Sequence, residues 1–156
     1  MSTPPAVLMV ELIMSINRMI NSAQNAGSRS TQWLKGRKDE WPAPVILGHI
    51  SQVDELVWLP RLNLMCAAQA AGENAPKFSW WEPDPEQTIA KFADQSLDEV
   101  AALAMSHRTT LLTAVKDLTP LQWQSQAKHD AFGEIDVSGL LIQVLTHDEE
   151  HRASLV

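Results

Sequence analysis

The spacing of apolar residues constrains the fold of this chain more than any other feature. Along four long segments, apolar side chains recur at intervals of three and four residues, which is the repeat of one face of an α-helix. In residues 6–24 the pattern consists of Met9, Ile13, Ile16, Ile20 and Ala23. The other segments cover residues 44–71, residues 85–118 or 96–118, and residues 136–156. No segment shows a convincing strand alternation.

Residues that start or stop helices mark the boundaries of the later segments. Pro60 should kink or divide the second helix, and Gly72 should end it. Ser96 opens a capping-box sequence, so the third helix either continues from Pro85 or starts afresh at Ser96. Asp136 suits the N-cap of the last helix. The inward-facing positions predicted for the last three helices are Ile46, Ile50, Val53, Val57 and Leu64; Val100, Ala104, His107, Leu111, Ala114 and Leu118; and Leu140, Val144, His147 and His151.

Four helices without strands predict an all-α fold, a four-helix bundle. A chain of 156 residues is long enough for a proper core and predicts a single domain over residues 1–156. The connections over residues 73–85 and 124–135 are long for an up-down bundle. Long connections often shape a binding site, so we expect them to border one.

Charge and composition narrow the classes of function. The net charge of −7 and the absence of any Lys/Arg cluster argue against nucleic-acid binding. Cys66 is the only cysteine, so there is no internal disulfide, which is compatible with a reducing cytosol. The apolar N-terminus lacks a basic region and a cleavage site, and Glu11 interrupts it. No uninterrupted apolar run is long enough for a membrane helix, and we expect a soluble, cytoplasmic protein.

Two histidines four residues apart point to a metal site. His147 and His151 continue the apolar spacing of Leu140 and Val144 on the last helix, so both imidazoles should face inward. Alternatively, the two histidines simply lie at the end of a helix and interact with its dipole. A metal site with an open position needs a third ligand from another helix. His49, near the start of the second helix, is the best candidate, the alternative being a partly buried histidine bonded to a neighbour.

At this point the chain resembles the DinB-like superfamily. The resemblance rests on Gly48-His49-Ile50, on Asp54, Trp58 and Arg61, on Phe132-Gly133-Glu134-Ile135, and on His147-Asp148-Glu149-Glu150-His151. It covers nearly the whole chain. It implies a four-helix bundle in which His49, His147 and His151 bind a divalent metal, and it also points to a homodimer. Members of that family include thiol S-transferases that use low-molecular-weight thiols and a mycothiol-dependent isomerase.

Three neutral imidazoles would leave the charge of a zinc or nickel ion uncompensated and a coordination position open. Such an ion lowers the pKa of a bound water or thiol. Our first hypothesis is therefore a transferase that joins a low-molecular-weight thiol to a small electrophile. The second is a metal-dependent hydrolase. The third is a stress-related binding protein with a structural metal, which would gain support if His107 supplied a fourth ligand.

Other residues carry weaker predictions. His107 and Asp148 are the only obvious candidates for an acid/base group. The alternative for His107 is a hydrogen-bonded histidine in the core, and the alternative for Asp148 is a solvated acidic helix face. His129 should be a structural loop residue, and Cys66 a buried apolar one. Arg108 is either exposed or paired with an acid of the last helix. Trp58, Trp80 and Trp81 are candidates for lining an apolar pocket, and we expect helices one and two to form the dimer interface.

Overall fold

The computed structural model describes residues 3–26 and 41–155, and within them the chain forms a helical bundle. Three long helices are α1 (Pro5–Asn25), α5 (Leu97–Lys116) and α6 (Val137–Ala153). The fourth is a continuous rod made of α2 (Ala43–Val53), the π-helical turn η3 (Asp54–Trp58) and α3 (Leu59–Ala71). Shorter elements are β1 (Lys77–Phe78), α4 (Pro85–Phe92), the 3₁₀ turn η4 (Gln122–Gln124), β2 (Gln126–His129) and β3 (Gly133–Asp136). The predicted all-α four-helix bundle is confirmed.

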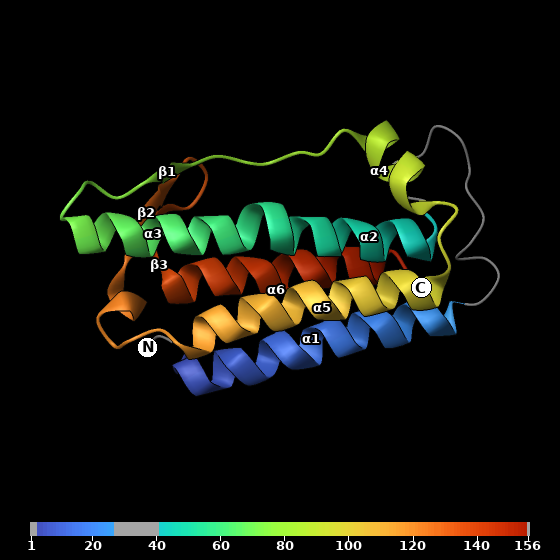
Figure 1. Cartoon of the computed structure of the whole chain (residues 1–156), viewed down its shortest axis with the longest axis horizontal. Helices are drawn as coiled ribbons and strands as arrows, with labels where there is room; N and C mark the ends of the chain where they lie inside the picture. The colour runs from blue at the N-terminus through green and yellow to red at the C-terminus, as the bar shows by residue number, and fades with distance from the viewer. Residues whose placement is uncertain (1–2, 27–40, 156) are drawn as a thin grey trace.

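The order of the helices in space differs from a simple up-down bundle. Figure 1 shows α1 and α6 running in one direction, and the α2–α3 rod and α5 running in the other. Helix α1 packs against α5 and α6, while α2 packs against α5. The segment between α3 and α5 returns along the outside of the α2–α3 rod (Figure 1). This return explains why the connection after Gly72 has to be long.

The expectation that the chain forms no strands is wrong for three short segments. Strands β2 and β3 form an antiparallel hairpin, and β1 adds to it in parallel. Each strand has only two to four residues, which is too short for an alternation to stand out in the sequence. Gly133 adopts a left-handed φ of 72° at the hairpin turn, a conformation that glycine takes without strain. The hairpin links α5 to α6.

Three predicted helix boundaries are confirmed. The Ser96 side chain accepts a hydrogen bond from the Glu99 amide at 3.1 Å, so α5 starts afresh and α4 is a separate helix. The Asp136 carboxylate accepts one from the Gly139 amide at 2.8 Å and caps α6. Gly72 ends α3 in the left-handed conformation, with a φ of 68°.

Pro60 divides the second helix through a π turn. The amide of Leu59 bonds to the carbonyl of Asp54, five residues earlier, and Pro60 has no N–H to continue the usual pattern. A π turn holds one extra residue, so the inward position after it falls one residue later than the spacing predicts. Met65 is buried, whereas Leu64, which we predicted to face inward, is 54% exposed.

The predicted inward face of α1 is confirmed at Ile16 and Ala23 but not in the first half of the helix. Leu8 and Leu12 are buried, whereas Ile13, predicted to face inward, is 46% exposed. The first half of this helix is apolar on several sides, so more than one stripe fits its sequence. By length and composition alone α1 could also cross a membrane, as the core helix of a soluble bundle often could. Its packing against α5 and α6 accounts for its buried side.

A buried ion network lies where the apolar core is interrupted. One apolar cluster contains Leu12, Val53 and Leu111, and the other contains Ile16 and Ile50. Between them lies Arg108, whose side chain is fully buried. On α5 this arginine, and not His107 as predicted, occupies the inward position. An arginine is expected at the surface from its residue type alone, and Arg108 can be buried only because buried carboxylates pair with it.

Every N–H group of Arg108 has an acceptor. Its Nε and Nη2 donate to the Asp54 carboxylate at 2.8 and 3.1 Å, and its Nη1 and Nη2 donate to the Asp148 carboxylate at 2.8 and 3.0 Å. Nη1 also donates to the Leu12 carbonyl at 3.1 Å, and the Ser15 hydroxyl donates to Asp148 at 2.7 Å. Burial alone would lower the pKa of Arg108, but the two carboxylates raise it well above its usual value. The network therefore joins all four long helices.

Gly48→Ala tests how α4 is held on the bundle. A Cβ at Gly48 would overlap the ring of Phe92 in α4. Helix propensity alone predicts that alanine stabilises this position by up to about 1 kcal/mol. Overpacking predicts a loss of about 1–3 kcal/mol in the free energy of unfolding, measured by urea denaturation. The double variant Gly48→Ala/Phe92→Leu should recover part of that loss, and a stabilised Gly48→Ala would contradict the observed packing.

Arg108→Met tests the buried network. The change strands two carboxylates in the core, so we expect the free energy of unfolding to fall by about 3–5 kcal/mol. Arg152→Met is the matched control, because Arg152 pairs with Glu149 at the surface of α6 with a shortest distance of 2.7 Å. That pair is exposed to solvent, so its loss should cost much less than the loss of the buried network. Equal costs for the two variants in urea denaturation would show that the buried network does not hold the bundle together.

Candidate metal centre

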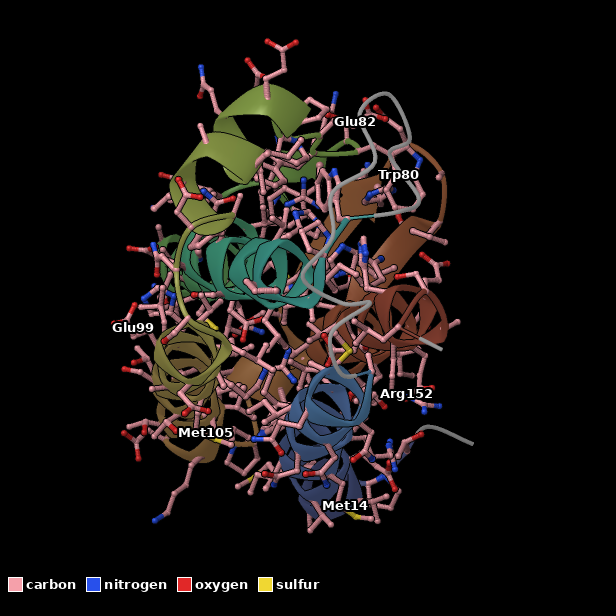
Figure 2. The ribbon with its side chains drawn as sticks, turned by 90° about the vertical axis from the view of Figure 1, so that its right-hand side faces the viewer. Met14, Trp80, Glu82, Glu99, Met105 and Arg152 are labelled. Carbon is pink, nitrogen blue, oxygen red and sulfur yellow. The ribbon has the colours of Figure 1, made fainter. Side chains whose placement is uncertain are left out.

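Three histidines from two helices meet at one end of the bundle. His49 comes from the second turn of α2, and His147 and His151 come from the last two turns of α6. These two helix ends lie together because the α2–α3 rod and α6 run in opposite directions. Figure 2 views the molecule from this end, with Arg152 marking α6. The predicted convergence of His49, His147 and His151 is therefore observed.

The distances between the ring nitrogens suit one bound ion. Nε2 of His49 lies 3.2 Å from Nε2 of His147, and one nitrogen from each of the three rings fits within 4.8 Å of the others. Tetrahedral zinc with Zn–N bonds of 2.0–2.1 Å separates its ligand nitrogens by about 3.3 Å. Without an ion, the same pair can share only one N–H···N hydrogen bond. The donor set of three imidazoles is one that zinc and nickel both accept.

Burial keeps these imidazoles neutral, which is the form that binds metals. It lowers the pKa of His49 to about 3, with smaller contributions from His151 and His147. Burial also lowers the pKa of His147 to about 3, helped by His151 and by the positive charge of Arg108. The pKa of His151 is lowered by burial as well. Burial therefore disfavours the protonated forms, which would compete with a metal for these nitrogens.

Tryptophan rings surround the histidines. Trp41 and Trp58 approach His49 and His147 edge to face, with ring centres 5.5 and 5.9 Å apart. Trp81, on the segment that crosses the outside of the bundle, stacks over His49 at 6.4 Å. Trp58 and Trp81 were predicted to line a pocket and do lie here. Trp80 instead contacts His129 at 5.1 Å, so its predicted place beside the other two is not observed.

The two weak acid/base candidates are engaged elsewhere. Asp148 is buried and bound to Arg108 and Ser15, so its explanation as a solvated acidic face is wrong. Of the two alternatives for Arg108, pairing with an acid of the last helix is the correct one. Nδ1 of His107 lies 2.7 Å from the Ser51 hydroxyl, and His107 does not belong to the histidine cluster. The cluster therefore gains no fourth ligand from His107.

Two further predicted residues have structural surroundings. His129 is buried at the end of β2, and its Nδ1 accepts a hydrogen bond from the Ala131 amide at 3.0 Å. It belongs to a strand and not to the expected loop, but it does stabilise the hairpin. Cys66 is half-buried and packs against the core.

Trp41 was not predicted to contact the centre, and no sequence signal pointed to it, because its contact with His49 depends on the tertiary fold.

Comparisons with known proteins agree with the fold. No curated protein matches this sequence. The structure is similar to that of the mycothiol-dependent maleylpyruvate isomerase, with a TM-score of 0.65, 14% identity, and coverage of 98% of this chain and 61% of that chain. It is also similar to YfiT from Bacillus subtilis, described as a probable metal-dependent hydrolase with an unusual four-helix bundle topology. There the TM-score is 0.64 at 14% identity, covering 94% of this chain and 83% of that chain.

The chain thus spans less than two thirds of the isomerase, and at this identity both structures speak for the fold alone. The family assignment rests instead on a family model. The model of the DinB superfamily matches residues 20–155, and the chain therefore belongs to the DinB superfamily.

Proposed function

We propose that this protein is a metal-dependent enzyme that transfers a low-molecular-weight thiol to a small electrophile. The observation that carries the proposal is the convergence of His49, His147 and His151, whose ligand nitrogens lie within 4.8 Å of one another. A zinc or nickel ion held by three such ligands keeps a position open and lowers the pKa of a thiol bound there. Both similar solved proteins carry related descriptions, one being mycothiol-dependent and the other a probable metal-dependent hydrolase.

The surroundings of the centre favour a nucleophile that arrives with the cosubstrate. A hydrolase benefits from a general base beside the metal, to activate a water molecule. Here the Asp148 carboxylate is not available to the centre, because it accepts hydrogen bonds from Arg108 and Ser15. His107 is bonded to Ser51. A thiol that is already ionised at the open position needs neither group, which is why we prefer thiol transfer to hydrolysis.

The proposal includes the expected cellular setting. Low-molecular-weight thiols stay reduced in the cytoplasm, which is the location that the sequence predicts. The homodimer also stays a prediction. The outer side of α1 is a suitable surface for it, because Val7, Val10, Ile13 and Met14 are each about half exposed there. Met14 points outward from α1 in Figure 2, away from the end of α6 marked by Arg152.

Metal content is the first test. Untagged protein purified without chelator should contain about one equivalent of a divalent transition metal by elemental mass spectrometry. His49→Ala and His151→Ala should each lose it, because two imidazoles hold an ion far less tightly than three. His107→Ala is the matched control and should retain the metal, since His107 lies outside the cluster. Metal that survives both ligand changes would refute the three-histidine site.

Thiol dependence is the second test. Metal-loaded protein should conjugate a chloronitrobenzene electrophile with at least one thiol from a panel of cysteine, glutathione, mycothiol and coenzyme A. Replacing a residue that only hydrogen-bonds to a metal ligand typically costs about 10–100-fold in affinity or activity. Replacing the ligand itself should cost more, so His49→Ala should lower kcat/KM by more than about 100-fold. His107→Ala should stay close to the unchanged protein. Hydrolysis of ester or amide substrates without any thiol would instead support the hydrolase alternative.

A further inference from the structure

Two tryptophan–histidine pairs beside the metal centre lack hydrogen-bond partners. Among the described residues, six buried side-chain N or O atoms have no partner, and four of them lie here. They are Nε1 of Trp41, Nδ1 of His49, Nε1 of Trp58 and Nδ1 of His147. The rings of each pair are in edge-to-face contact, at 5.5 Å for Trp41 with His49 and 5.9 Å for Trp58 with His147. The shortage of partners is therefore concentrated at one site.

All four atoms become donors once the histidines bind an ion through Nε2. An indole nitrogen can only donate, and an imidazole that is coordinated through one nitrogen carries its hydrogen on the other. Ligating histidines normally donate that hydrogen to a carboxylate, a backbone carbonyl or a water molecule. A buried donor without an acceptor is destabilising. The described residues supply donors around this centre without the matching acceptors.

The charges at the centre also favour a negative partner. The histidines bring no negative charge to compensate a divalent ion. The nearest buried carboxylate, Asp148, accepts two hydrogen bonds from Arg108 and one from Ser15. On the more open side, Glu150 lies near His151. The interior around Trp58 and His147 thus combines unused donors with an uncompensated positive charge.

We propose that Trp58 and Trp41 determine ligand specificity by donating their indole N–H groups to a small carboxylate bound at the three-histidine centre. The inference rests on the proposed function and specifies its ligand: the small molecule at this site carries an oxygen anion. Trp58 is 6% exposed, so bulk solvent has little access to its unpartnered indole N–H beside His147. The indole rings of Trp41, Trp58 and Trp81 lie close to the histidines, which favours a small ligand.

Indole N–H resonances test this donation directly. Formate serves as the probe, added to protein loaded with one equivalent of zinc, in two-dimensional proton–nitrogen NMR spectra. Trp41→Phe and Trp58→Phe assign their resonances, because each variant lacks one indole signal. Both signals should move downfield as formate binds, and the Trp80 signal should not, since Trp80 lies against His129. Signals that stay in place at saturating formate would overturn the proposal and leave water as the acceptor.

Calorimetry of formate binding provides the second measurement. One lost hydrogen bond of about 1 kcal/mol corresponds to a roughly fivefold weaker affinity. Trp58→Phe and Trp41→Phe should each show that loss while retaining zinc, and Trp80→Phe should match the unchanged protein. An equal loss in all three variants would contradict a specific role. Should Trp58→Phe fail to fold, the shift in the unchanged protein and the Trp41→Phe titration still decide.

Carboxylate binding and thiol transfer can be tested independently of each other. Formate binding requires neither a thiol nor turnover. Formate that binds through both indoles, in a protein without thiol transfer, would refute only the proposed reaction. Thiol transfer without any formate binding would refute only the carboxylate ligand. A protein that binds no zinc would overturn both, because the tautomers assumed here depend on coordination.

Discussion

The rest of the structure depends on one buried cation and its two carboxylates. Arg108 of α5 bonds to Asp54 of the π turn, to Asp148 of α6, and to the Leu12 carbonyl of α1. Apolar packing is not directional, so the apolar stripes alone allow each helix to rotate or slide. Hydrogen bonds with fixed geometry remove that freedom. The network therefore sets the rotation of α1 and the position of α6 along the bundle axis. The position of α6 in turn places His147 opposite His49.

The sequence predicted those parts of the fold that depend on local patterns. Helix periods, the Ser96 and Asp136 caps and the Gly72 stop all report on neighbouring residues, and each was confirmed. Features that depend on distant contacts were missed. The face of α1 was predicted only in part, because the first half of its sequence is apolar on several sides. On α5, Val100, Ala104 and Leu111 are buried as predicted, but His107 was wrongly placed inward, because Arg108 takes that position through Asp54 and Asp148, which lie 54 and 40 residues away.

The histidine site was predictable for a related reason. The four-residue spacing of His147 and His151 fixes their relation within one helix, whatever the rest of the chain does. The third ligand, His49, needed the family resemblance and the assumption that two helix ends meet. The indole rings around the centre gave no such signal. Trp41 lies just before α2 and Trp81 on the segment outside the bundle, so both reach His49 only through the tertiary fold.

The buried ion network and the histidine cluster are linked through adjacent residues of α6. His147 faces the metal centre, and Asp148, the next residue, faces Arg108 because successive helical side chains diverge by about 100°. The carboxylate that would ordinarily support a ligating histidine is thus committed to the fold. The centre is left with neutral imidazoles and indole donors, and an incoming molecule has to supply the negative charge. The interaction that holds the helices together therefore also limits the chemistry available at their end.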